Sequence, residues 1–203
     1  QICGEASVLY SFYPNSIKQI LNFNKDAKII FMVRNPLEMV QSYHQQLINN
    51  LEETVSNFEN AWNLQDKRAQ GHKIPYSSQD ADLLQYREKS RLGSQLQKLN
   101  AIVPKKQLMV ITLDEMAQDP LNVYDKVLQF IGVVPDERQD FQKENEAFLV
   151  RFKLLRQILI KHNWLRKIFI TIIPTQRLNL LNRKKINKKI LSPVLKEQLI
   201  QEF

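Results

Sequence analysis

The stretch that most constrains the fold is AKIIFMVRNPLEMVQSYHQQL, residues 27–47, in which an apolar run passes directly into a helical pattern. The run KIIFMV at 28–33 is nearly continuous, and a second such run, QLMVITL, occupies 107–113. Continuous apolar runs of this length are typical of strands covered on both faces in a parallel sheet. A third run, from Val8 to Phe12, is weaker and is expected to be mostly loop.

Apolar residues at helical spacing fill the intervals between the runs. They predict a helix over 15–24, with Asn15 or Ser16 as its cap, and a helix over 36–49. Pro36 suits the first helical position, because the N–H that proline lacks is not needed there. Further helices are predicted within 50–80 and 80–103, from the cap Asp119 and Pro120 to the C-cap Gly132, and after Ser192 and Pro193.

The alternation of strand and helix indicates the α/β class, with a parallel sheet flanked by helices. We expect one domain over 1–203, with an α/β core at 1–134 and a basic, largely helical part at 135–203. With 43% apolar and 25% charged residues, the composition is that of an ordinary globular protein.

Positive charge is concentrated near the C-terminus. Residues 147–203 hold 13 of the 29 lysines and arginines but 2 of the 21 acidic residues. Segment 147–170 has the pattern of a basic amphipathic helix or helix pair, which fits a packed scaffold helix, a wall for an anionic glycan, or an interfacial helix on acidic lipid. Nucleic acid is disfavoured, because aromatic residues are too sparse for a stacking platform.

The chain begins with Gln1, shows no leader, and has no apolar run of about 18 residues that could span a bilayer. It reads as a fragment or processed product of a soluble protein. Its single cysteine, Cys3, allows no internal disulfide, and no Cys/His set is spaced for a metal. The expected location is the cytoplasm, with peripheral membrane contact as an open alternative.

Arg34 follows the last residue of the first predicted strand and precedes a helix start. In open parallel sheets, ligands bind beyond the carboxyl ends of the strands, where helix N-termini favour anions. A phosphate there would receive a charge-assisted contact from Arg34, and Ser42 could add a hydroxyl. The competing interpretation is an ordinary solvated arginine or the partner of a nearby carboxylate.

The segment KIIFMVRNPLEMVQSYHQQL resembles the 3′-phosphate-binding strand, turn and helix of sulfotransferases that use 3′-phosphoadenosine 5′-phosphosulfate. In that family an Arg-Asp-Pro turn is followed, eight residues after the arginine, by a serine. Arg34 and Ser42 fit this spacing, and Asn35 replaces the usual aspartate.

Three further segments resemble the same family in the same order. They are GEASVLY at 4–10, the stretch from LGSQLQ to FIGV at 92–133, and ILSPVLKEQLIQEF at 190–203. The resemblance is greatest to the carbohydrate-type enzymes, including the heparan sulfate enzymes and their bacterial relatives.

The resemblance implies a P-loop-kinase-like fold and transfer of a sulfuryl group from 3′-phosphoadenosine 5′-phosphosulfate to a hydroxyl or amine of a carbohydrate or lipid. Adenosine 3′,5′-bisphosphate would be the product. Arg34 and Ser42 would hold the 3′-phosphate, and Arg183, Lys184 and Lys185 fall where the family places a basic loop over it, although the usual glycine is absent. The chemistry requires no metal.

Parts of the family pattern are not found in this chain. The loop that holds the 5′-phosphosulfate and the usual catalytic carboxylate would precede Gln1, and Ala6 stands where many relatives have lysine. Glu5 and His44 are the candidates for catalytic groups in this chain. Glu5 reads equally well as a surface acid, and His44 reads more simply as an exposed helix residue.

Two other functions compete with the sulfotransferase. A nucleotide kinase would share an α/β phosphate-binding core, but no Gly-x-x-x-x-Gly-Lys-Ser/Thr motif occurs in the sequence. A degenerate module of the same fold would bind a nucleotide, another anion or a glycan without turnover, and this alternative stays open.

Overall fold

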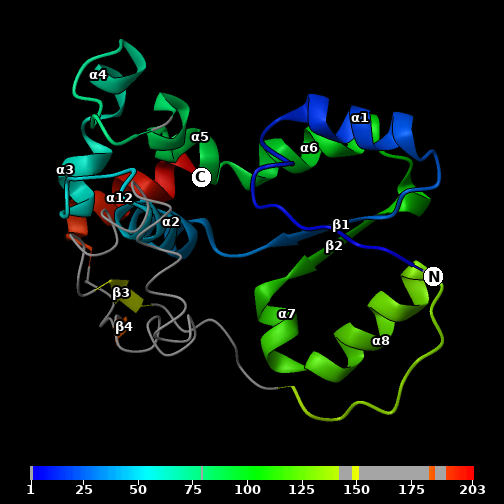
Figure 1. The fold of residues 1–203 in the computed structure, drawn as a ribbon. Coiled ribbons are helices and arrows are strands. Elements are labelled where there is room, and N and C mark those ends of the chain that lie inside the picture. The colour runs from blue at the N-terminus through cyan, green and yellow to red at the C-terminus, as the bar shows by residue number, and fades with distance from the viewer. Residues whose placement is uncertain (1, 79, 142–147, 151–182, 186–190) are drawn as a thin grey trace, which may run out of the picture. The chain divides into compact units, whose positions relative to one another are not determined.

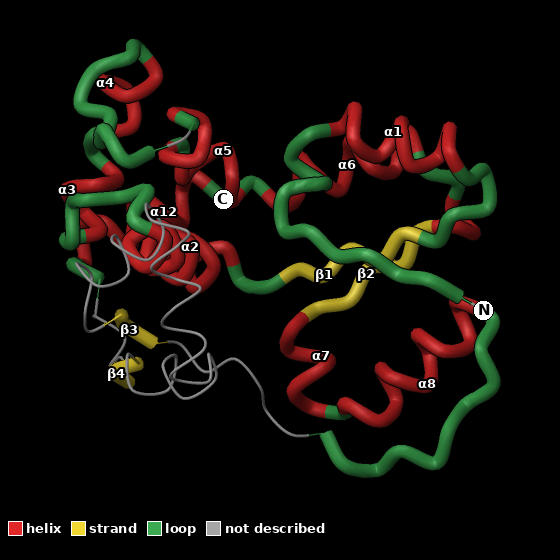
Figure 2. The backbone as a smooth tube through the Cα atoms, in the orientation of Figure 1, coloured by secondary structure: helices red, strands yellow, loops and turns green. Residues whose placement is uncertain are grey.

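The computed structural model describes residues 2–78, 80–141, 148–150, 183–185 and 191–203 (Figures 1 and 2). The chain forms two compact units. The first consists of Gln1–Pro36 with Lys89–Gln142, and the second of Leu37–Glu88 with Lys143–Phe203.

A parallel pair of strands forms the centre of the first unit. Strand β1 (Ile29–Val33) pairs with β2 (Leu108–Thr112) in a register that runs from Ile29 opposite Leu108 to Val33 opposite Thr112. Helices α1 and α6 lie over one face of the pair, and α7 and α8 lie on the other side (Figure 1). The helical elements are α1 (Pro14–Phe23), α6 (Leu92–Ile102), the short η2 (Lys105–Gln107), α7 (Leu113–Gln118) and α8 (Pro120–Ile131). The predicted α/β class with a parallel sheet is confirmed.

The core of this unit joins β1 to α1 and α6. Ile17, Phe31, Leu99 and Val103 are buried together and are surrounded by half-buried aliphatic side chains from the same elements. At the amino end of β2, the buried Gln107 donates hydrogen bonds of 2.5 and 3.1 Å to two backbone carbonyls just before β1. Gln107 therefore fixes the relative position of the two strands.

The opposite face of β1 is only partly covered in the described part of the chain. Ile30 and Met32 are 36% and 52% exposed, whereas Ile111 on β2, which shares their face, is buried. The apolar runs thus predicted the parallel pairing correctly, but their prediction that both faces are covered does not hold for β1 within the described residues.

The ends of α8 follow their local sequence signals, whereas the start of α1 departs from them. Asp119 caps α8 by accepting a hydrogen bond of 3.1 Å from the Asn122 N–H, and Gly132 ends it with φ of 80°. The predicted cap of α1 at Asn15 or Ser16 is wrong: α1 begins at Pro14, with Tyr13 as cap residue and no side-chain hydrogen bond. Proline at the first position, where its missing N–H costs nothing, moves the helix start forward.

The second unit is built mainly from helices. Its elements are α2 (Pro36–Asn50, whose first residue is assigned to the first unit), α3 (Phe58–Trp62), α4 (Gln65–Ala69), η1 (Ala81–Leu84), α5 (Tyr86–Ser90, which crosses the unit boundary), β3 (Phe148–Val150), β4 (Arg183–Lys185) and α12 (Pro193–Glu202). The single long helical segment predicted over 80–103 is divided into η1, α5 and α6. Pro36 opens α2, and Ser192 caps α12, as the sequence predicts.

An apolar core joins α2, α3, α5 and α12. Val40, Ala61, Leu84, Tyr86 and Leu199 are fully buried in it. Because α12 contributes two buried leucines to this core, the C-terminal helix is an integral part of the second unit.

Inside this unit lies a buried ion pair. Arg68 and Glu53 have no exposed side-chain surface, and the guanidinium donates two hydrogen bonds of 2.6 and 2.9 Å to the carboxylate. The hydroxyl of Tyr86 donates to the same carboxylate at 2.5 Å, and the N–H groups of Thr54 and Val55 donate to it at 2.8 Å. This network ties the loop after α2 to α4 and α5.

The predicted basic helix over 147–170 is wrong at residues 148–150, which form β3. Strand β3 pairs with β4 in an antiparallel register, with Phe148 opposite Lys185 and Val150 opposite Arg183, and this backbone pairing requires an extended chain. The rest of the predicted helix lies outside the described residues. The proposed division of the chain near residue 134 stays a prediction. Among the described residues, no helix is both long enough and apolar enough to cross a membrane.

We predict that Arg68→Met lowers the free energy of unfolding by about 3–5 kcal/mol, because it leaves the Glu53 carboxylate buried without its counter-charge. Urea denaturation followed by circular dichroism measures this. The control is Lys67→Met on the same helix, where the side chain is exposed and the change should stay within about 0.5 kcal/mol. Equal losses for the two variants would contradict the structural role of the ion pair.

We also predict acid sensitivity from Glu53. Burial raises the pKa of Glu53, but hydrogen bonds from Arg68, Tyr86 and the Val55 N–H outweigh burial, so its pKa lies below the ordinary value. A carboxyl with a lowered pKa in the folded state stabilises the fold above the unfolded-state pKa, and that stabilisation is lost as pH falls through the folded-state pKa. Unfolding free energy measured from about pH 7 to pH 3 should therefore fall less steeply in Glu53→Gln than in wild type or in the exposed control Glu137→Gln. Parallel curves for all three proteins would refute this assignment.

Candidate active site

The carboxyl ends of β1 and β2 lie at one edge of the sheet, since the strands are parallel and Val33 is opposite Thr112. The chain leaves β1 through Arg34 and leaves β2 directly into α7. This edge is where open parallel sheets bind ligands. Sequence and structure therefore agree on the location of Arg34.

Arg34 is held partly inside the protein. Its side chain is half-buried, and its Nε atom is buried. A guanidinium in such a position loses less conformational freedom on binding than an exposed one, and water screens its charge less. Arg34 therefore stays a candidate for binding a phosphate or sulfate group.

The start of α7, at the same edge, satisfies its own backbone groups. Thr112 Oγ1 accepts a hydrogen bond of 3.1 Å from the Glu115 N–H, and Glu115 accepts hydrogen bonds of 2.9 and 2.8 Å from the N–H and hydroxyl of Thr112. The hydrogen bond from the Thr112 N–H lowers the pKa of Glu115 most, and the hydrogen bond with the Thr112 side chain lowers it further. A carboxylate already occupies this helix start, so Arg34 is the better candidate for binding an anion here.

Ser42 is half-buried on α2, the helix that follows Arg34. It belongs to the second unit, whereas Arg34 belongs to the first. The role of Ser42 as a second contact to a 3′-phosphate stays a prediction from its spacing.

His44 is a residue of the second-unit interior. It is 4% exposed, its Nε2 lies 2.8 Å from the Val55 carbonyl, and its ring packs against Phe58 and Tyr86 at centroid distances of 5.5 and 5.8 Å. The expectation that it is an exposed helix residue is wrong, because α2 turns this side chain inward. These contacts account for His44 as a packing residue, and its catalytic role stays an unsupported prediction.

Glu5 is exposed, and its carboxylate is hydrogen-bonded to Tyr10. This hydrogen bond, with some burial, raises the pKa of the Tyr10 hydroxyl. Tyr10 in turn packs on the core of the first unit, so the contact attaches the N-terminal segment to that unit. Whether Glu5 takes part in catalysis stays a prediction.

Arg183, Lys184 and Lys185 form β4. Their predicted contact with a 3′-phosphate stays a prediction. Within the described residues, no group of acidic, histidine or cysteine side chains is arranged to hold a metal ion.

The structure contains a polar cluster in the first unit that the sequence analysis did not predict. The side chain of Lys89 is buried, with Nζ 3.1 Å from the ring centroid of Phe12 and 4.8 Å from that of Tyr13. Gln95 accepts a hydrogen bond of 2.7 Å from Ser11 and donates one of 3.0 Å to the Lys89 carbonyl. The contact between Ser11 and Gln95 joins residues 84 positions apart, so no local pattern indicates the cluster.

Comparison with known proteins agrees with this fold. The family model described as the sulfotransferase domain matches residues 11–149. Among solved structures, the sulfotransferase from Alicyclobacillus acidocaldarius is similar, with a TM-score of 0.54 and 30% sequence identity over 70% of this chain. The chain spans 56% of the length of that protein. No curated protein sequence matches significantly.

A parallel pair of strands flanked by helices defines the general class, that of α/β proteins with a P-loop-like fold, as in the similar solved sulfotransferase. Because the family model covers more than half of the chain, the chain belongs to the sulfotransferase domain family. The matched region contains Arg34, Ser42 and His44 but neither Glu5 nor the basic residues of β4.

We predict that His44 acts through packing and not as a catalytic base. His44→Leu should lower the free energy of unfolding by about 1–3 kcal/mol, because the half-buried Val55 carbonyl loses its partner, while nucleotide affinity stays unchanged. Thermal unfolding and calorimetric titration measure the two effects. The control His72→Leu, at an exposed position, should change neither. Full stability combined with loss of sulfuryl transfer would instead support the catalytic assignment.

Proposed function

We propose that this chain forms the 3′-phosphate side of the donor site of a sulfotransferase that uses 3′-phosphoadenosine 5′-phosphosulfate. The observation that carries the proposal is the half-buried Arg34 at the carboxyl edge of a parallel strand pair, inside the region that matches the sulfotransferase domain.

The chemistry of Arg34 suits this ligand. A phosphate monoester carries close to two negative charges at neutral pH, and a planar guanidinium can donate two parallel hydrogen bonds to its oxygens. The 3′-phosphate distinguishes this donor from adenosine nucleotides that carry only a 5′-phosphate. We propose Ser42, Arg183, Lys184 and Lys185 as further contacts to the same group.

In the proposed reaction, an oxygen or nitrogen of the acceptor attacks the sulfur atom. The new bond forms as the bond from sulfur to the bridging phosphate oxygen breaks, and adenosine 3′,5′-bisphosphate leaves. The acceptor proton passes to a base, for which Glu5 is the candidate in this chain. Cationic groups lower the barrier by stabilising charge on the leaving phosphate. We propose a carbohydrate or lipid as acceptor.

We predict that Arg34→Ala removes selective recognition of the 3′-phosphate. Wild type should bind adenosine 3′,5′-bisphosphate more tightly than adenosine 5′-monophosphate, by about tenfold or more if Arg34 makes a charge-assisted contact worth about 1.5–3 kcal/mol. In Arg34→Ala the two affinities should become nearly equal. Isothermal titration calorimetry with both nucleotides measures this difference directly.

The matched control is Lys105→Ala, which removes a positive charge at the start of β2, the opposite end of the same strand pair. It should keep the preference of wild type. If Arg34→Ala also keeps that preference, or if wild type shows none, the proposed 3′-phosphate site is wrong.

A further inference from the structure

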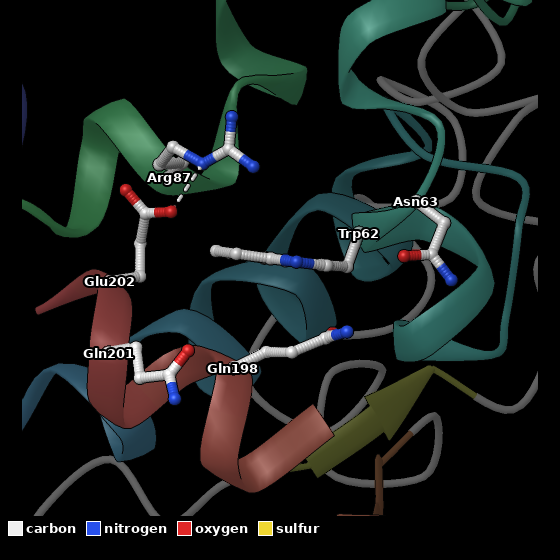
Figure 3. A pocket seen from close by; sticks show the side chains of 6 residues that line it. All are labelled: Trp62, Asn63, Arg87, Gln198, Gln201 and Glu202. Atoms are coloured by element: carbon white, nitrogen blue, oxygen red, sulfur yellow. Dashed lines mark ion pairs between the residues drawn. The ribbon is translucent and has the colours of Figure 1, made fainter. Parts of the chain in front are cut away.

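The second unit contains a polar groove bounded by α3, α5 and α12, with a volume of about 360 Å³ (Figure 3). None of its lining residues is among those of the proposed donor site. Its lining consists of Trp62, Asn63, Arg87, Gln198, Gln201 and Glu202. A volume near 300–400 Å³ is at the lower end of the range for small-ligand sites.

One wall of the groove is held by a buried glutamine. Gln65 is 2% exposed; its Oε1 accepts a hydrogen bond of 2.7 Å from the Arg87 N–H, and its Nε2 donates one of 2.9 Å to the Trp62 carbonyl. The Gln65 carbonyl accepts a further hydrogen bond of 3.3 Å from Gln85. Trp62 and Arg87 are therefore fixed relative to each other before any ligand binds, which reduces the entropy cost of binding.

The charges of the groove are already paired. Arg87 Nε lies 2.9 Å from a carboxylate oxygen of Glu202, an ion pair visible in Figure 3, and Arg87 also lies 3.8 Å from Asp66. The guanidinium carbon is 5.7 Å from the ring centroid of Trp62. An anionic ligand would have to compete with two carboxylates for this arginine, so the groove favours an uncharged ligand.

The remaining polar groups are carboxamides. Asn63, Gln198 and Gln201 are exposed at the groove, and Figure 3 shows Gln198 and Gln201 on one side of Trp62, with Asn63 beyond its backbone end. Each carboxamide offers two N–H donors and one carbonyl acceptor in a plane. A hydroxyl both donates and accepts, so neighbouring hydroxyls on a sugar ring match this surface. The paired Arg87 and Glu202 can also bind hydroxyls without a change in net charge.

We propose that this groove binds an uncharged saccharide. The proposal does not depend on the donor site. If the donor-site proposal also holds, saccharide binding favours carbohydrate over lipid as the acceptor class. Titration of the same protein with adenosine 3′,5′-bisphosphate tests the donor site, and titration with saccharides tests the groove, so the failure of one proposal is distinguished from the failure of the other.

The test uses Trp62 as its own reporter. The chain has two tryptophans, so Trp164→Phe leaves Trp62 as the single source of indole fluorescence. Titration of this variant with cellotetraose, maltotetraose and chitotetraose should give a saturable change in emission with at least one of them. Saturation-transfer NMR on the unmodified chain provides the same answer without any substitution.

The groove residues are tested by a double substitution. The double variant Gln198→Ala/Gln201→Ala should bind the saccharide with about tenfold lower affinity, because two hydrogen-bonding side chains are lost. Both positions are exposed, so the substitutions should not disturb the fold. Gln70→Ala, the same change at an exposed position outside the groove, should leave affinity unchanged. Sucrose octasulfate should not compete. The proposal is overturned if none of the three saccharides binds, if the double variant binds as wild type does, or if the sulfated sugar binds the groove in their place.

Discussion

The candidate site depends on the parallel pairing of β1 with β2. Gln107 fixes the amino ends of the pair through two carbonyls, and Val33 and Thr112 end the strands opposite each other. A slip of one residue would turn Phe31 out of the core, so packing against α1 and α6 enforces the register. With the register fixed, the residue after Val33 has to emerge at the ligand-binding edge of the sheet, and that residue is Arg34.

The burial and contacts of Arg68, Lys89 and Arg34 distinguish cationic side chains that stabilise the fold from one proposed to bind a ligand. Arg68 is fully buried and donates to both carboxylate oxygens of Glu53, so it serves the fold of the second unit. Lys89 lies on the rings of Phe12 and Tyr13 inside the first unit. Arg34 is half-buried at a strand end and belongs to neither apolar core of the described residues. Of the three, Arg34 has the position expected of an anion-binding residue.

Features fixed by neighbouring residues could be predicted from the sequence. The two strands, the helix start at Pro36 and the caps at Asp119 and Ser192 depend on side chains within a few positions, and the structure agrees with each. The contacts among Glu53, Arg68 and Tyr86 could not be predicted, because they join residues 15 and 33 positions apart. The inward position of His44 could not be predicted for the same reason, because it depends on packing against Phe58 and Tyr86, which are distant in sequence. At 148–150 pairing with a distant segment prevails over a helical pattern, as strand pairing can override local preference.

The central claim is that Arg34 binds the 3′-phosphate of the sulfuryl donor. A crystal structure of the chain with adenosine 3′,5′-bisphosphate tests it most directly. The account predicts the 3′-phosphate at the carboxyl edge of β1, with its oxygens within about 3 Å of the Arg34 guanidinium nitrogens. A nucleotide bound elsewhere on the chain, or bound at this edge with its 3′-phosphate away from Arg34, would contradict it.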